Sequence, residues 1–363
     1  MHLQQLHIKN FRCFTQKTIS FPSKITLIEG LNGSGKTSLL ESIHYLCYLR
    51  SFRTHAPREL LQFGHDTFFL KAQLVPESDG ITSHETELQV GFSGKKRLVK
   101  INQKGISSYK ELMDHYRVVT LTEDDLSIIS GSPQERRAFI DHVLLLYDAD
   151  FAQASHSLRH IVTSRNRALQ SGVLDKTMYH ILTQQLWQAS RIVQSHRRRG
   201  LERLQTETTT IIHNFFDDAP HITFDYNEAL TDGHATLEAF LADRPTLYAD
   251  ELRYRRSLFG AHLDDILIKF YEKRSRMFAS RGQQKLIILL LKLAQMSELA
   301  RTRGQAIFLL DDFMTDFDEK RAHIFMKVLQ GLGNQIIFTS PLKQGFLHDI
   351  LLEAGAGQVV LTD

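Results

Sequence analysis

The sequence has little cysteine, little net charge and no long apolar segment. Only Cys13 and Cys47 occur among 363 residues, which excludes a disulfide framework and a zinc site built on paired C-x-x-C motifs. The net charge of +3 does not by itself indicate a polyanionic partner, although local patches can bind one. The longest apolar run, 286–291, is far shorter than the ~20 residues that span a bilayer, and the polar N-terminus is unlike a signal peptide. We therefore expect a cytoplasmic protein with no membrane partner.

The two ends of the chain alternate strand and helix patterns. Buried or alternating runs predict strands at 2–11 and 24–30, and apolar residues at helical spacing predict a helix over 36–49. The pattern between about 67 and 104 indicates further strands. After residue 280 come a helix, a buried strand, a second helix and a second strand.

The middle of the chain has a different pattern. From about 122 to 215 it is mostly helical, with no proline between Pro133 and Pro220, and the weak signals at 220–258 predict no element. There is no internal repeat and no low-complexity linker. Alternating strands and helices around a helical middle predict an α/β domain interrupted by an insertion.

The segment GLNGSGKTS at 30–38 fits the phosphate-loop pattern G-x-x-x-x-G-K-[ST] at every fixed position, between a predicted strand and a predicted helix. Its glycines let the backbone wrap a phosphate, Lys36 would reach the β- and γ-oxygens, and Thr37 would hold Mg²⁺. The alternative, a chance glycine turn, is disfavoured because motif and context agree. We predict a nucleotide site that includes Gly30, Leu31, Asn32, Gly33, Ser34, Gly35, Lys36, Thr37 and Ser38.

An acidic partner for this loop follows a second buried strand. Four apolar residues, 307–310, run into Asp311 and Asp312, and ligands of such sheets bind beyond the carboxyl ends of the strands. We expect Asp311 to serve the metal and Asp312 to orient or deprotonate the attacking water. Two exposed carboxylates in a turn would be the simpler alternative.

A second candidate anion site opens the apolar helix predicted after residue 280. Helix N-termini leave N–H groups unpaired and attract anions, although Ser280 could equally be an ordinary helix cap. Residues 277–318 resemble the signature, Walker B and D-loop of ATP-binding-cassette proteins, in that order. The resemblance assigns the signature to Ser280, Gly282 and Gln283, and the D-loop aspartate to Asp318. In that superfamily the signature contacts the γ-phosphate bound to the other subunit, which implies an ATP-dependent homodimer.

Further segments resemble one family along nearly the whole chain, the RecF family of bacterial recombination mediators. They are N-F-R at 10–12, GLNGSGKTSLLESI, SFRTHAPRELLQFG, EDDLSIISGSPQERRAFID, GAHLDD at 260–265 and ASRGQQK. There are departures: Phe52 stands where the family usually has histidine, Ala261 and Leu263 replace proline and arginine, and TDFD replaces S-E-L-D. The resemblance implies that Arg12 approaches the nucleotide.

The expected fold is α/β: an ABC-type ATPase head, with a P-loop sheet, flanking helices and an antiparallel β subdomain, plus an inserted mainly helical lobe. We expect the ATPase domain at 1–118 and 259–363, with the lobe at 119–258. Transporter subunits usually hold Lys36 and Asp311 much closer in sequence. SMC-type proteins insert long coiled coils, but no run of three heptads is visible here.

The resemblance further implies a weak, DNA-stimulated ATPase using ATP and Mg²⁺, in DNA repair, replication and the SOS response. Its partners would be double-stranded DNA, single/double-strand junctions, and RecR with RecO in the pathway that loads RecA. Two basic groups could contact phosphates, each also readable as a solvated face. One is Lys95–Lys104, around a hairpin expected to turn at Ser93 and Gly94; the other is Arg191–Arg203. For Arg136 and Arg137 a structural pairing with Glu123 or Asp141 is the alternative.

Three alternatives remain open: a transporter ATPase subunit, an SMC-like structural ATPase that binds nucleotide without turnover, and a P-loop kinase. A transporter subunit would hydrolyse ATP regardless of DNA, and a kinase would act as a monomer on an acceptor.

Overall fold

The computed structural model describes residues 2–75, 85–94, 96–106, 111–112, 116–172, 174–216, 220–229, 233–313, 317–340 and 346–361. The chain divides into two compact units: the first is Met1–Asp125, Asn214–Asp217 and Lys292–Asp363, and the second is Leu126–His213 and Asp218–Leu291. These divisions differ from the expected domain boundaries at 118/119 and 258/259, which stay a prediction.

A five-stranded parallel sheet lies in the first unit, in the order β14-β3-β13-β12-β8. Two of its central strands, β3 and β13, are buried along their whole length, as parallel strands covered on both faces are. The runs of valine, isoleucine, leucine and phenylalanine in the sequence account for this burial. The strands are β3 (Ile25–Glu29), β8 (Val118–Leu121), β12 (Ile307–Asp311), β13 (Ile336–Ser340) and β14 (Gly357–Val360).

The helices of this unit include α1 (Lys36–Tyr48), α11 (Glu319–Leu332) and α12 (Phe346–Glu353). Twelve of the thirteen residues of α1 are buried, so this helix belongs to the core rather than to the surface. It ends where Leu49 adopts a left-handed conformation with φ 52°.

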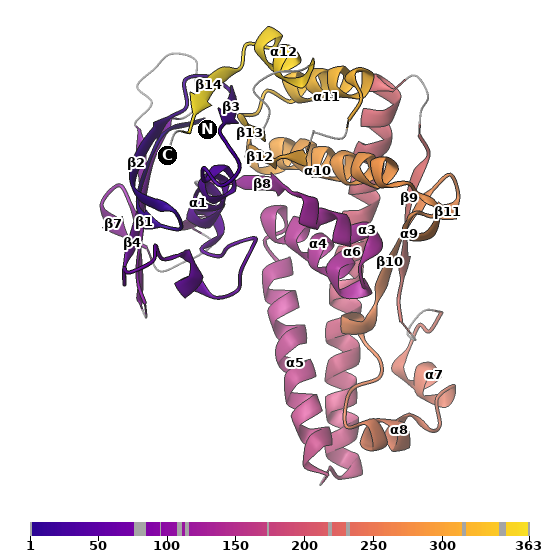
Figure 1. The fold of residues 1–363 in the computed structure, drawn as a ribbon. Coiled ribbons are helices and arrows are strands. Elements are labelled where there is room, and N and C mark those ends of the chain that lie inside the picture. The colour runs from indigo at the N-terminus through magenta and orange to yellow at the C-terminus, as the bar shows by residue number, and fades with distance from the viewer. Residues whose placement is uncertain are drawn as a thin grey trace. The chain divides into compact units, whose positions relative to one another are not determined.

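A six-stranded antiparallel sheet, in the order β2-β1-β4-β5-β6-β7, is the other sheet of the first unit (Figure 1). Alternate residues, such as Leu6 and Ile8 of β1, are fully buried on the face that contacts α1, and the residues between them are more exposed. The strands are β1 (His2–Phe11), β2 (Phe14–Ser20), β4 (Phe68–Val75), β5 (Thr86–Ser93), β6 (Lys96–Ile101) and β7 (Lys104–Gly105).

The second unit is mainly helical and contains a three-stranded sheet, β11-β10-β9. Its longest helices, α5 (Phe151–Ser171) and α6 (Lys176–Phe215), follow one another in the chain. Its other helices are α3 (Ser127–Ser130), α4 (Pro133–Tyr147), α7 (Leu237–Ala242), α8 (Leu247–Tyr254) and α9 (Ser275–Phe278). Its strands are β9 (Ile222–Asn227), β10 (Asp265–Phe270) and β11 (Lys273–Arg274).

Short 3₁₀ turns occur at Pro57–Leu60, Glu123–Leu126 and Ala261–Leu263. Helix α10 (Arg281–Arg303) contributes residues to both units. Among the described residues, no helix is both long and apolar enough to span a bilayer.

Most expected elements are confirmed: the strands at 2–11 and 24–30, the helix from Lys36, the hairpin ending β5 at Ser93, and the α10-β12-α11-β13 succession. The region 220–258, for which no element was expected, contains β9, α7 and α8. These three elements are short, six to eight residues each, which explains their weak periodicity.

Candidate nucleotide site

The phosphate-loop segment connects β3 to α1 in a conformation that requires glycine. Gly33 and Gly35 have φ values of 90° and 96°, which residues with a Cβ atom rarely adopt. A Cβ atom on Gly30 would lie 2.3 Å from the Ser34 hydroxyl oxygen, so the first glycine is required by close approach. The loop thus exposes its backbone at the N-terminus of α1, where an anion is favoured.

Lys36 and Ser34 place polar groups at this loop that no described side chain from outside the loop is seen to bind. The Lys36 side chain is buried, and its Nζ donates to the carbonyl oxygens of Gly30 (3.0 Å) and Leu31 (3.1 Å). The hydroxyl of Ser34 is buried and has no hydrogen-bond partner among the described residues. Leu31 and Asn32 are exposed, whereas Ser38 is buried at the start of α1. A ligand with oxygen atoms would satisfy the hydroxyl and give Lys36 a charged partner.

Asp311 is the last residue of β12 and Asp312 follows it, and β12 is separated from β3 by β13 alone. The Thr37 hydroxyl donates to Oδ1 of Asp311 at 3.1 Å, although 274 residues separate them in sequence. The Thr339 hydroxyl at the end of β13 lies 2.8 Å from the same carboxylate oxygen. Three neighbouring strand ends therefore bring together oxygen atoms of the kind that Mg²⁺ prefers.

Asp312 has a strained backbone and a perturbed carboxyl. Its φ is 48°, and its N–H donates to the Thr339 hydroxyl at 3.0 Å. Burial raises the pKa of the Asp312 carboxyl, and the adjacent charge of Asp311 raises it further. A carboxylate with a raised pKa is a better proton acceptor than an ordinary aspartate.

Thr339 is a further member of the site, and no sequence motif marks it. Its hydroxyl lies within hydrogen-bond distance of both carboxylates, at 2.8 Å from Asp311 Oδ1 and 3.3 Å from Asp312 Oδ1. Its position near the carboxyl end of the buried strand β13 is the sequence feature that could have indicated it. The pairing of strands β12 and β13 decides the contact.

Arg12 is held against α1 by an ion pair with Glu41. Its Nε and a terminal nitrogen both donate to the carboxylate of Glu41 at 2.7 Å, and the other terminal nitrogen donates to the Glu59 carbonyl. Glu41 is fully buried, so this bidentate pair fixes the β1–β2 turn to α1. The implied approach of Arg12 to a nucleotide stays a prediction.

The signature residues form a capping box at the start of α10. The Ser280 hydroxyl accepts from the N–H of Gln283 at 3.3 Å, and the side chain of Gln283 accepts from the N–H of Ser280 at 2.8 Å. Asp318 similarly caps α11 by accepting from the N–H of Arg321 at 2.9 Å. Ser280 and Asp318 are exposed, and Gly282 is half-buried. Contact with a second subunit's nucleotide stays a prediction for all of them.

Comparisons with known proteins show the family of this chain. Residues 2–353 match the family described as "RecF/RecN/SMC N terminal domain". The chain belongs to the RecF family. "DNA replication and repair protein RecF" of Chlorobaculum tepidum is 30% identical over 356 residues, covering 95% of each chain. The protein of the same name from Desulfitobacterium hafniense is 29% identical over 370 residues, covering 99% of each chain.

Solved structures confirm the expected fold, an ABC-type ATPase head with a helical lobe. The "recombination mediator protein RecF-ATP in RecFOR pathway" superposes with a TM-score of 0.81 at 24% identity, covering 94% of this chain and 92% of that one. The Smc head domain of Pyrococcus furiosus superposes with a TM-score of 0.56 at 15% identity, covering 97% and 91%.

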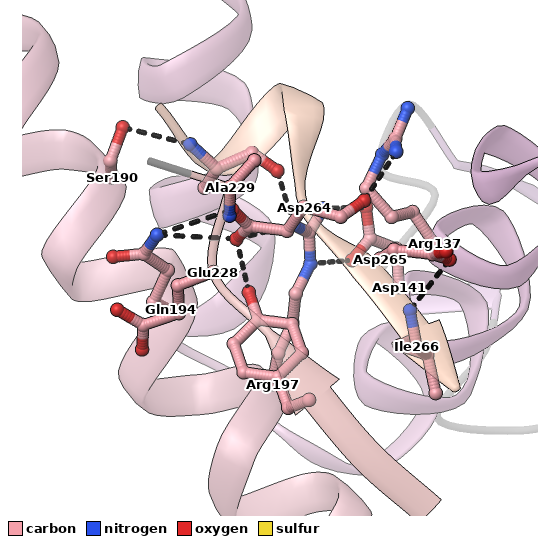
Figure 2. A network of polar contacts seen from close by, with 12 residues as sticks. Arg137, Asp141, Ser190, Gln194, Arg197, Glu228, Ala229, Asp264, Asp265 and Ile266 are labelled. Carbon is pink, nitrogen blue, oxygen red and sulfur yellow. Dashed lines mark hydrogen bonds and ion pairs between the residues drawn. The ribbon is translucent and has the colours of Figure 1, made fainter. Parts of the chain in front are cut away.

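The motif of this RecF-family chain at 260–265, GAHLDD, contributes to a polar network in the second unit (Figure 2). Asp264 is fully buried and accepts from Gln194 (3.2 Å), Tyr226 and the N–H of Ala229 (3.0 Å). Its own carbonyl accepts from Arg137. The network ties β10 to α4, α6 and the end of β9, so we assign the second half of the motif a structural role.

The departures within this motif fit the network. The Ala261 N–H donates to Ser190 at 3.1 Å, a bond that the proline usual in RecF could not make. Burial lowers the pKa of His262 to about 4, with the Arg137 charge contributing, so its imidazole is neutral at pH 7. Leu263 is 39% exposed.

Arg136 and Arg137 make structural pairings, and the charge of Asp141 acts on Arg137, as one alternative expected. Arg136 forms a bidentate pair with Asp265 at 2.7 and 3.0 Å, and Arg137 donates to the carbonyl of Asp264. Both arginines thus bind the start of β10. The sequence could not indicate this because 129 residues separate Arg136 from Asp265.

The basic cluster Arg191–Arg203 is not one exposed patch. Arg197 is 3% exposed and forms a bidentate pair with Asp141 at 2.7 and 2.9 Å. Arg191 and Arg198 both pair with Glu228. Acids from other elements therefore neutralise much of the charge that appeared uncompensated along α6.

The other basic group lies on the β5–β6 hairpin. Lys96 and Lys104 are exposed, Lys100 is half-buried, and Lys95 lies outside the described residues. Arg97 turns toward the covered face, where its Nε donates to the Tyr45 hydroxyl at 3.1 Å. In the strand order of the antiparallel sheet, this hairpin is next to β7.

Proposed function

We propose that this RecF-family chain is an ATP-dependent DNA-repair ATPase that pairs with a second copy around DNA. The observation that carries the proposal is the Thr37–Asp311 contact, which joins the phosphate loop to the acidic end of β12. A phosphate loop without such a partner could be a simple glycine turn. A loop hydrogen-bonded to a strand-end carboxylate, beside an orphaned buried hydroxyl at Ser34, fits a nucleotide with its metal.

Each polar residue of the site has a role in this proposal. The backbone of Gly30–Gly35 would cradle the phosphates, and Lys36 would leave its two carbonyl partners for the β- and γ-oxygens. Thr37 and Asp311 would hold Mg²⁺, which when bound offsets the negative charge of the phosphates. Asp312 would orient the attacking water and accept its proton. Aspartate is one methylene shorter than the glutamate common at this position, so we expect slow hydrolysis.

The second copy would complete the site. Ser280, Gly282 and Gln283 present a helix N-terminus and a hydroxyl, which suit a γ-phosphate bound by the partner, and Asp318 would lie at the same interface. Met277 and Phe278, next to them, are 73% and 61% exposed. Large apolar side chains this exposed support a surface that another protein covers.

The names of the relatives support a proposal for the pathway. Their printed names place them in DNA replication and repair, and the superposed structure is named as a mediator in the RecFOR pathway. We therefore propose double-stranded DNA and single/double-strand junctions as ligands, RecR with RecO as protein partners, and RecA loading as the outcome. DNA would stimulate the weak hydrolysis that resets the dimer.

Light scattering tests the dimer directly. The Asp312→Asn chain should have a mass of 41.8 kDa alone and roughly double with Mg-ATP, carrying a short duplex with it. Ser280→Arg should bind a fluorescent ATP analogue normally but stay monomeric, because an arginine at the cap blocks the shared site. Ser171→Arg, an exposed change at the end of α5, is the matched control and should dimerise. A Ser280→Arg dimer would overturn the shared-site proposal.

A further inference from the structure

The uncovered face of the six-stranded sheet has a hollow where four strands align. The register pairs Lys9 of β1 with Phe69 of β4, Phe69 with Gly91 of β5, and Gly91 with Leu98 of β6. Cross-strand partners share a face, and this row alternates with the buried residues Ile8, Leu70 and Val90. The row therefore lies on the solvent side.

Gly91 makes the hollow. A Cβ atom placed on it would meet a single neighbour, the Phe69 ring at 4.0 Å, so the space above this glycine is open. The hollow has a volume of about 700 Å³ and is lined on this face by Phe69, Leu98, Lys9 and Lys96. Leu98 is 58% exposed and Phe69 is half-buried. The floor is apolar and aromatic.

The rim of the hollow is cationic. Lys9 is exposed on one side, and Lys96 and Lys100 occupy alternate positions of β6 on the other, roughly 14 Å away across three strand spacings. Each lysine lacks a carboxylate partner among the described residues, whereas Lys71 on the same face pairs with Glu87. None of the lining residues is acidic.

An aromatic and apolar floor between uncompensated cations is complementary to a nucleic acid strand with an accessible base. We propose that this hollow takes an unpaired base of a DNA strand against Phe69 and Leu98, with the flanking phosphates on Lys9, Lys96 and Lys100. Bases inside a duplex are stacked and cannot enter. The inference rests on the proposed function in DNA repair and gives it a surface that distinguishes single from double strands.

The decisive variant is Gly91→Leu, which fills the hollow without changing the charge. The position has room for a side chain, so the sheet should accept it. Fluorescence anisotropy with labelled dT20 should show binding weakened about 10-fold. Binding of a 20-base-pair duplex with Mg-ATP should stay within about twofold of the wild type, as should that of Gln73→Leu, a control on the same face but outside the hollow.

The charges are tested separately. Lys96→Ser/Lys100→Ser should weaken dT20 binding and reduce its logarithmic salt slope by about 1.4, the value for two phosphates of a single strand. Lys176→Ser, an exposed lysine at the start of α6, is the control and should change neither.

Each outcome has a defined meaning. If the Gly91→Leu variant bound dT20 as tightly as the wild type does, the hollow would not be a base site. The proposal that the chain binds duplex DNA would be unaffected. A wild-type chain that binds neither DNA would instead overturn the proposed function. Equal competition by poly-glutamate and unlabelled dT20 would make the hollow an acidic-peptide site and refute the nucleic-acid assignment.

Discussion

Two carboxylates of this molecule, the half-buried Asp312 in the first unit and the fully buried Asp264 in the second, have opposite surroundings. Burial raises the pKa of both carboxyls. The next influence on Asp264 is the Tyr226 hydroxyl, which lowers its pKa, whereas the next influence on Asp312 is the charge of Asp311, which raises it. The Tyr226 hydroxyl therefore offsets part of the effect of burial on the pKa of Asp264, whereas the charge of Asp311 adds to that effect at Asp312.

This difference distinguishes the structural network around Asp264 from the candidate ligand site at Asp311 and Asp312. Asp264 has its donors supplied by α6, β9 and the segment after it, so nothing is left for a ligand. Asp311 and Asp312 share one threonine hydroxyl, which carries one proton and cannot donate to both. The two adjacent carboxylates repel one another, and a metal ion bound between them would relieve that repulsion.

The largest expected effect is on hydrolysis in Asp312→Asn. Removing the proton acceptor should reduce kcat by about 10²- to 10⁴-fold while nucleotide binding persists. In the wild type, the rate should fall as the pH drops through the raised pKa of Asp312, at a higher pH than for an ordinary aspartate. A phosphate-release assay across pH measures both.

Asp349→Asn is the matched control for this change, because Asp349 lies in α12 with its side chain 72% exposed. It should hydrolyse ATP like the wild type. An Asp312→Asn chain with unchanged kcat would remove Asp312 from the chemistry and leave the raised pKa as a by-product of burial.

The second-largest expected effect is on the stability of the Asp264 network. Arg197→Met should destabilise the second unit by about 3–5 kcal/mol, because Asp141 loses its bidentate partner and Asp264 its nearby cation. The single tryptophan, Trp187, is buried in α6, so its fluorescence during urea unfolding reports this unit.

Arg199→Met on the same helix removes an exposed arginine and should change stability by less than about 0.5 kcal/mol. Equal stability of the two variants would show that the Asp264 network does not depend on Arg197. Binding of a fluorescent ATP analogue by the first unit should be normal in both.

The sequence predicted the first site better than the second network. The phosphate loop, Asp311 and Asp312 follow strands with strong apolar runs, and strand ends of a parallel sheet meet at one edge. Local sequence patterns therefore suffice to identify the phosphate loop, Asp311 and Asp312 as site residues. Identifying Thr339 also requires knowing that β13 lies between β3 and β12 in the sheet.

The network could not be predicted in the same way. Arg197 looked like part of a basic patch because its acids, Asp141 and Asp264, are 56 and 67 residues away and belong to other elements. The short strand β9, which supplies Tyr226, had no clear period. Charge compensation across elements depends on tertiary packing, and a one-dimensional count of charges misses it.

The smallest expected effect tests whether the lone hydroxyl between the two carboxylates matters. Thr339→Val keeps the shape of the side chain but removes the oxygen that accepts from the Asp312 N–H and donates to Asp311. Both carboxylates should then be less well oriented, lowering kcat about 10-fold with KM for ATP nearly unchanged, a split that a general loss of folding would not produce. Thr339→Ser retains the hydroxyl and should restore most of the rate. If valine and serine gave the same kcat, Asp311 and Asp312 would be positioned by the strand ends alone, and the contrast with the donor-rich Asp264 would be greater still.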